Sequence, residues 1–165
     1  MAQSSGRSTS KKAQSHFYRA VTSTPVLASA YRPGLQAIAS ADKTKIVCRH
    51  PQRLKGSVCV DEILQPIKPH DPRWDYAIGH SDTTGTEQIV WAEVHPAESG
   101  SNLGEMDKKL LWLTDWLKAE VPAMNYNPRR IVWVASGRSS FSANDPKLRK
   151  LRQRGFEFVG SRLVL

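Results

Sequence analysis

Hydrophobic and polar positions alternate most clearly in the middle of the chain. Residues 74–80 (WDYAIGH) predict a strand, and residues 88–95 (QIVWAEVH) predict a second one. The second run is almost continuously apolar, which is typical of a strand covered on both faces. The intervening SDTTGTE has turn composition, so the two strands are expected to form a hairpin. The period of two places Trp74, Tyr76 and Ile78 on one face, and Asp75, Ala77 and Gly79 on the other.

The C-terminal half predicts two helices that alternate with strands. Residues 105–119 carry apolar side chains at helical spacing, and RIVWVAS (130–136) reads as a buried strand. Asp145-Pro146 is an N-cap signal for a helix that ends before Gly155, and FEFVGSRLVL closes the chain with one or two strands. Strand–helix–strand–helix–strand implies parallel strands with right-handed crossovers.

The first third of the chain gives weaker signals. Residues 34–41 (GLQAIASA) predict a short helix, whereas 45–50 (KIVCRH) and 57–64 (SVCVDEIL) predict two antiparallel strands. Residues 1–15 are rich in Ser, Lys and Arg and predict a disordered basic arm. We therefore expect one α/β domain over residues 16–165, with a mixed central β-sheet flanked by helices.

Charge changes sign twice along the chain. Residues 1–60 hold ten Lys or Arg and one acid, residues 61–107 hold two bases and ten acids, and residues 108–165 hold twelve bases and four acids. Two interpretations stay open: solvated charged faces, or a polyanion-binding surface around an acidic metal site. No apolar run reaches membrane-spanning length, so no membrane partner is expected. Two cysteines without a disulfide pattern favour a reducing cytoplasm.

The acidic segment places three polar side chains where chemistry is possible. Glu93 and His95 lie two apart on one strand and share a face, and the hairpin brings Asp75 beside Glu93. Two carboxylates at this separation suit Mg²⁺, which also binds waters and substrate phosphate. A carboxylate in so apolar a strand costs desolvation energy unless it is paired or bound to metal. Asp61 ends the preceding strand and is a further candidate acid.

This layout resembles the PD-(D/E)XK nuclease superfamily, in which an Asp on one strand precedes Glu-x-Lys on the next, followed by a helix and a strand. The matching parts are Asp75, Glu93-Val94-His95, the helix 105–119 and the strand 130–136. The resemblance covers residues 57–140 and implies a restriction-endonuclease-like core. It also implies Mg²⁺ or Mn²⁺ at Asp75 and Glu93. The chain departs from the pattern in having His95 for lysine and Trp74 for proline, and in lacking an evident Glu on an early helix.

Each candidate residue also has a structural interpretation. Asp75 can bond a turn or Arg73, Glu93 can pair with a buried Lys or Arg, and His95 can be held by ordinary hydrogen bonds. Glu105 and Asp107 suit the start of a helix. Lys108 and Lys109 are solvated surface or reach a phosphate above the site.

Three hypotheses for function follow. The first is a metal-dependent nuclease acting on DNA, in which Asp75, Glu93 and His95 are catalytic. The second is a catalytically inactive module that binds nucleic acid or protein on the same fold. The third is an unrelated α/β domain in which the two acids are structural. The side chains expected to hold a nucleic-acid backbone are Lys11, Lys12, Lys108, Arg149, Lys150 and Arg152.

Overall fold

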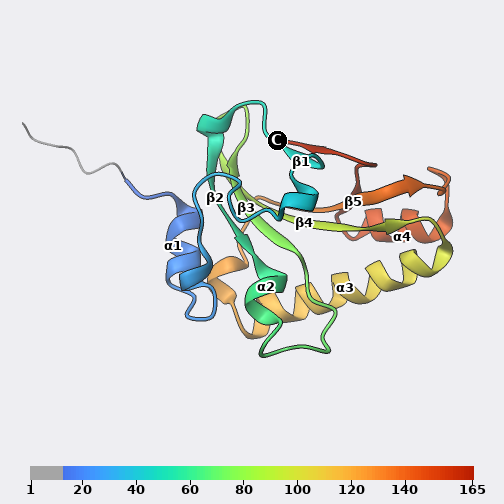
Figure 1. Ribbon diagram of the computed structural model, residues 1–165, viewed down its shortest axis with the longest axis horizontal. Coiled ribbons are helices and arrows are strands. Elements are labelled where there is room, and N and C mark those ends of the chain that lie inside the picture. The colour runs from blue at the N-terminus through green and yellow to red at the C-terminus, as the bar shows by residue number, and fades with distance from the viewer. Residues whose placement is uncertain (1–12) are drawn as a thin grey trace, which may run out of the picture.

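The computed structural model describes residues 13–165, which build a five-stranded sheet in the order β2-β3-β4-β5-β6 (Figure 1). Strand β3 runs antiparallel to both of its neighbours, β2 and β4, whereas β4, β5 and β6 are parallel. The predicted α/β class with a mixed central sheet is therefore confirmed. The strands are β2 (Leu54–Cys59), β3 (Tyr76–Ser81), β4 (Glu87–Ala97), β5 (Arg129–Ser139) and β6 (Phe156–Phe158).

Side chains of the central strands alternate between two buried layers. Trp91 and Trp133 face a core that includes α1, α3 and α4, whereas Val90 and Val132 face a second core. The second core is closed by a short parallel pair, β1 (Ile46–Val47) with β7 (Leu163–Val164). This two-sided burial explains why β4 reads as a continuous apolar run. The helices are α1 (His16–Thr22), α2 (Val60–Leu64), α3 (Gly100–Ala119) and α4 (Pro146–Gln153), with 3₁₀ turns at Ala28–Ala30, Ser40–Asp42, Pro51–Arg53 and Pro122–Met124.

Helix α3 starts one turn earlier than its apolar periodicity predicts. The side-chain oxygen of Asn102 accepts hydrogen bonds from the backbone N–H groups of Glu98 and Ser99, at 3.0 and 3.1 Å. This cap fixes the helix start at Gly100. Leu103 in the first turn is buried and lies three residues before Met106, so it extends the apolar stripe towards the N-terminus, and the start predicted at residue 105 left it out.

Helix α4 has the ends that its sequence predicts. The Asp145 side chain accepts hydrogen bonds from the backbone N–H groups of Lys147 and Leu148, as an N-cap does. Gly155 follows the helix with φ of 80°, a left-handed conformation that favours glycine. Leu148 and Leu151 are buried, which leaves the basic side chains of the helix at the surface.

Several predictions for the first half are wrong. The segment 57–64 is not one strand: β2 ends at Cys59 and α2 begins, because the Asp75 carbonyl accepts the Val60 N–H at 2.7 Å. The segment 45–50 does not pair with β2, since only β1 is extended there and its partner is β7. Residues 34–41 form turns and the start of a 3₁₀ turn instead of a helix.

Two further details depart from the sequence-based expectations. Trp74 precedes β3 and packs in the core with Ala77 and α3, not with Tyr76 and Ile78, because the backbone is irregular before Tyr76. Strand β5 runs past residue 136 to Ser139. The predicted arm lies mostly outside the described residues, as do Lys11 and Lys12. Within residues 13–165, no helix has the length and apolarity needed to cross a membrane.

Candidate active site

The two predicted acids lie side by side at one end of the β3–β4 hairpin. Tyr76 pairs with Ala92, so the next pair outward is Asp75 with Glu93. The Asp75 N–H donates to Glu93 Oε2 at 3.0 Å, and Asp75 Oδ2 accepts the Val94 N–H at 2.8 Å. The hairpin geometry expected from the sequence is therefore present, although the carboxylate of Asp75 also bonds the backbone of β4.

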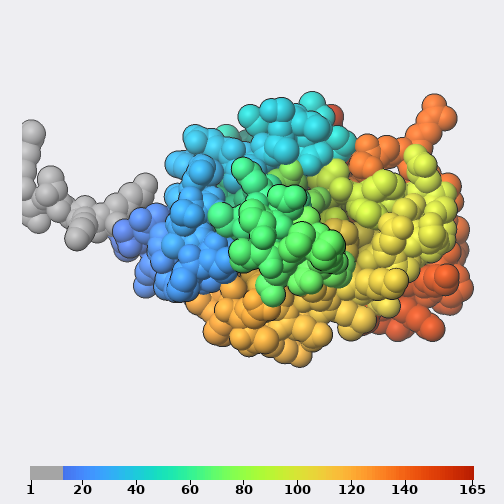
Figure 2. Space-filling view, turned by 60° about the horizontal axis from the view of Figure 1, so that its bottom comes forward, coloured from blue at the N-terminus to red at the C-terminus, as the bar shows by residue number. Residues whose placement is uncertain are grey.

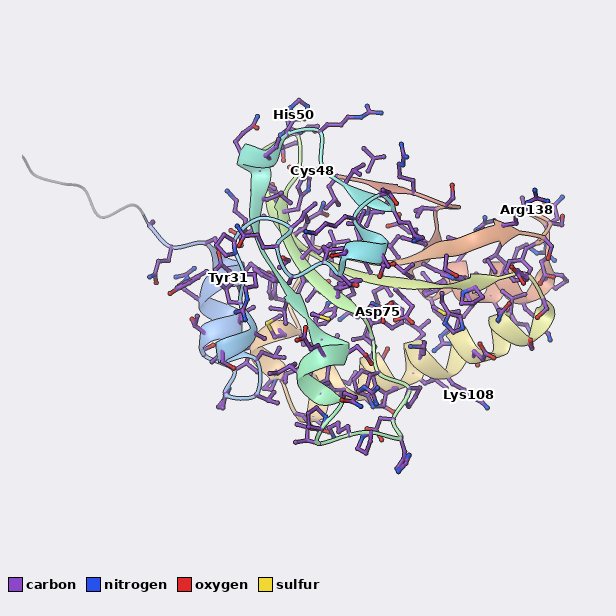
Figure 3. All side chains as sticks on the ribbon, viewed as in Figure 1. Tyr31, Cys48, His50, Asp75, Lys108 and Arg138 are labelled. Carbon is purple, nitrogen blue, oxygen red and sulfur yellow. The ribbon has the colours of Figure 1, made fainter. Side chains whose placement is uncertain are left out.

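The local fold explains why Asp75 occupies this position. Its carbonyl caps α2 through the N–H groups of Val60 and Asp61, at 2.7 and 3.4 Å. This contact turns β2 away from β3 and ends the regular ladder. The N–H of Val94 would then lack a strand partner, and the Asp75 carboxylate supplies one. Figure 3 labels Asp75 just before the start of β3.

Lys109 from α3 completes the acidic pair. Its Nζ lies 2.6 Å from Glu93 Oε1 and donates to the Arg73 carbonyl at 2.5 Å. The Lys109 side chain is 17% exposed and that of Glu93 is 2% exposed, so the ion pair is largely removed from water. The structure thus places an ammonium group beside Glu93 from a residue 16 positions later in the sequence. This pairing with a lysine is also the structural alternative that the sequence left open.

His95 joins the same cluster through two contacts. Its Nδ1 lies 3.8 Å from Glu93 Oε1, and its Nε2 lies 2.5 Å from Glu105 Oε2. The predicted shared side of Glu93 and His95 is therefore observed. The hydrogen bond from His95 lowers the pKa of Glu105. Glu105 thus acts as the orienting partner of His95, and not only as a charge near the start of a helix.

Burial dominates the electrostatics of the acidic pair. Desolvation raises the pKa of Glu93 to about 8, with a further increase from the charge of Asp75 and an opposing effect of Lys109. Burial also raises the pKa of Asp75 to about 6, opposed by the Val94 hydrogen bond and by Lys109. One ammonium group therefore does not fully compensate two buried carboxylates. A site of this kind favours an additional cation or a proton.

The donor set fits a hydrated divalent cation rather than a closed protein cage. No group of three or more His, Cys, Asp or Glu side chains gathers as a metal site within residues 13–165. Mg²⁺ commonly binds through one or two carboxylates and keeps several waters, and Asp75 and Glu93 are the two carboxylates that could hold such an ion here. Asp61 is not a third ligand, because it pairs with Arg73 at 2.8 Å and its side chain is 44% exposed.

Four of the predicted nucleic-acid contacts lie on α3 and α4: Lys108, Arg149, Lys150 and Arg152. Lys108 is exposed on the outer side of α3 (Figure 3), and Arg149 and Lys150 are exposed on α4. Arg152 is also exposed, but its guanidinium donates to the Ala143 carbonyl at 3.0 Å and so holds the preceding loop. These positions agree with a basic surface, and their binding role stays a prediction.

Sequence reasoning missed the role of Lys109, although a signal for it was present. The buried stripe of α3 contains Met106, Leu110, Leu113 and Leu117. At 100° per residue, Lys109 lies about 70° from the centre of this stripe, whereas Lys108 lies on the opposite side.

Comparison with protein-family models, with curated proteins and with solved structures finds no match to this chain.

Proposed function

We propose that the protein is a metal-dependent nuclease that hydrolyses DNA phosphodiesters at Asp75 and Glu93. The contact between Lys109 and Glu93, at 2.6 Å, carries this proposal. It sets an ammonium group against the acidic pair, as the lysine does in the superfamily that the sequence resembles. On this proposal, Lys109 from α3 would serve in place of the lysine that the sequence lacks at position 95.

The roles of the side chains follow from their contacts. Asp75 and Glu93 would hold Mg²⁺ or Mn²⁺, which lowers the pKa of a bound water and steadies charge on the scissile phosphate. Lys109 would position the attacking water and stabilise the negative charge that develops on the phosphate. His95, oriented by Glu105, is placed to move a proton at Nδ1, the ring nitrogen that faces Glu93.

The basic parts of the chain would hold the DNA backbone. The net charge is +9, and the acidic segment is concentrated around the candidate site. Lys108 is exposed on α3, the helix that also carries Lys109, and the other exposed cations lie on α4, which packs against α3. The two cysteines are free thiols, in keeping with a reducing compartment such as the cytoplasm, which is part of the same proposal.

One observation favours the alternative, a catalytically inactive module that binds nucleic acid or protein. Both carboxylate oxygens of Glu93 already have partners, Lys109 for Oε1 and the Asp75 N–H for Oε2. A cation would have to displace or share these contacts. An ion pair that serves only the fold would look the same.

Cleavage assays with matched acid variants separate these functions. Supercoiled plasmid and single-stranded DNA are incubated with Mg²⁺ or Mn²⁺ and with wild type, Asp75→Ala, Glu93→Ala or Asp115→Ala. Asp115 is an exposed acid on α3 outside the cluster, so its variant controls for lost negative charge. We expect Asp75→Ala and Glu93→Ala to abolish cleavage and Asp115→Ala to retain it.

The opposite results are equally informative. If purified wild type cuts neither substrate with either metal, the binding-module function replaces the nuclease. If Glu93→Ala cuts as well as wild type, another site carries the activity. Circular dichroism of each variant checks that lost activity does not come from lost folding.

A further inference from the structure

A groove between α3 and α4 lies on the far flank of α3 from the acidic pair. It encloses about 360 Å³ and is lined by Leu103, Gly104, Asp107, Lys147, Lys150, Leu151 and Arg154. The two helices lie next to each other, α3 in yellow and α4 in orange-red (Figure 2). A volume of this size is within the range of small-ligand sites. The groove is therefore large enough for part of a nucleotide.

The groove has an apolar floor and a cationic rim. Leu103 and Leu151 are 2% and 3% exposed and form the floor. Arg154 pairs with Asp107 across the groove. Lys147 and Lys150 are exposed, and neither makes an ion pair with a residue in the described part of the chain. The rim thus offers two uncompensated ammonium groups above an apolar surface.

The groove and the acidic pair flank the same turns of α3. Glu105 and Lys109 face the acidic pair, and Leu103 and Asp107 face the groove. Lys108 points outward between the two flanks, as its helical phase requires. A helix with its side chains is about 10–12 Å wide, so one strand of nucleic acid can pass over Lys108 and reach both flanks.

We propose that the α3–α4 groove binds a nucleotide of the substrate strand adjacent to the scissile phosphate. Lys147 and Lys150 bind its phosphate, and the sugar and one base edge lie on Leu103 and Leu151. This inference rests on the proposed function for the adjacency of the two sites. The two ammonium groups match a phosphate in charge, and the volume of about 360 Å³ leaves room beside that phosphate for the sugar and a base edge, which favours a nucleotide over a simple anion.

Gly104 allows a steric test that leaves the charges unchanged. A Cβ at this position meets no atom within 4 Å, so a larger side chain enters the groove without a clash. Leucine and alanine both favour a helix interior over glycine by about 1 kcal/mol. Gly104→Leu therefore fills the groove without unfolding α3, and Gly104→Ala is its matched control.

The experiment measures binding in EDTA, where hydrolysis does not interfere. Fluorescence anisotropy follows a labelled oligothymidylate of about ten nucleotides with the full-length protein at several salt concentrations. The charge variant is Lys147→Gln/Lys150→Gln, and its control, Lys43→Gln/Lys118→Gln, removes two exposed charges elsewhere. We expect the groove pair to weaken binding by about tenfold and to reduce the salt slope by about 2. Gly104→Leu should weaken binding with little change in slope, and Gly104→Ala, which adds a single methyl group, should weaken it much less than Gly104→Leu.

Three results would overturn the groove as a nucleotide site. They are equal weakening by the control pair, unchanged affinity of Gly104→Leu, and equal competition by a polyglutamate peptide of the same charge, which would indicate an acidic protein partner. Groove-dependent binding by a wild type that does not cleave DNA would leave the groove standing and reject the nuclease. If wild type cleaves DNA and the groove variants bind as tightly as wild type, the nuclease stands and the groove is rejected as a nucleotide site.

Discussion

The β3–β4 hairpin buries a polar side chain near each of its ends, and the two side chains differ in how many polar partners contact them. Glu93 is 1% exposed and contacts Lys109, His95 and the Asp75 N–H. His80 is 6% exposed, and neither of its ring nitrogens has a hydrogen-bond partner among residues 13–165. Residues 13–165 therefore supply partners to Glu93 and none to His80. Partners drawn from a separate helix are costly to arrange, and they distinguish a candidate active site from an isolated buried polar group.

Removing the ammonium group of Lys109, and then returning one at position 95, should have the largest effect on DNA cleavage. Lys109→Met should reduce DNA cleavage by at least about 100-fold, because the ammonium beside Glu93 is lost. Lys108→Met, one residue away on the outer side of α3, is the matched control for the chemical steps. Adding His95→Lys to Lys109→Met returns an ammonium to the Glu93 side of β4 and should recover part of the activity. The measurement is plasmid cleavage at saturating Mg²⁺.

This exchange also tests which lysine matters. Recovery in the double variant would show that the ammonium group is needed, whichever element provides it. Equal losses from Lys109→Met and Lys108→Met would instead point to general attraction of DNA. Full activity of Lys109→Met would remove Lys109 from the mechanism and leave the ion pair as a structural feature.

The sequence predicts one half of this site and not the other, for physical reasons. Asp75 and Glu93 are joined by a short hairpin, so strand periodicity alone brings them together. Lys109 reaches Glu93 only after α3 has packed against β4, and that docking depends on a helix start set by Asn102. Helical phase alone predicts that Lys109 lies beside the buried stripe of α3. It does not predict that Glu93 is the partner of Lys109.

The same limit explains the errors in the fold. Local patterns were sufficient for β3, β4, β5 and α4, whose neighbours follow one another along the chain. Strand β1 pairs with β7, more than 100 residues away, and each holds only two residues. The end of β2 depends on a hydrogen bond from Val60 to the Asp75 carbonyl. Neither contact leaves a periodic signal in the sequence.

The pH dependence of stability should expose the buried acid. Because the pKa of Glu93 is about 8 in the fold and near 4.5 when unfolded, the native state retains a proton that the unfolded state releases between these values. Rising pH across this window therefore favours unfolding, by up to about 1.4 kcal/mol per pH unit. Glu93→Gln should remove the dependence between pH 6 and 8, whereas Asp75, with a pKa of about 6, still titrates below.

Urea unfolding of wild type and Glu93→Gln from pH 5 to 8.5, in EDTA, measures this difference. Subtracting the two curves cancels the groups that both proteins share. A difference that does not change with pH would mean that Glu93 is ionised throughout, with Lys109 fully compensating its charge.

Removing the ammonium group of Lys109 should leave Glu93 as poorly compensated as His80 is at the other end of the hairpin. Lys109→Met leaves the buried carboxyl without its ammonium and should cost about 2 kcal/mol at pH 8. The cost is below that of a fully buried pair, because Lys109 is 17% exposed and the carboxyl can take up a proton. It should shrink at pH 5, and Glu93→Gln/Lys109→Met should regain most of the stability. A loss that is the same at both pH values would assign the effect to packing of the lysine stem.

The smallest effect is expected at His80. Burial lowers its pKa, helped by the charges of Arg53 and Arg130, so the folded protein holds the neutral ring. Unfolding lets the ring take up a proton below about pH 6.5, and stability from this group is lost as the pH falls through that value. His80→Leu removes two unpaired buried nitrogens and should stabilise the protein by about 1 kcal/mol, more at pH 5.5 than at pH 8. His50→Leu, at an exposed histidine, should show neither change. Destabilisation by His80→Leu at both pH values would mean that His80 has a partner, and the contrast between the two ends of the hairpin would no longer hold.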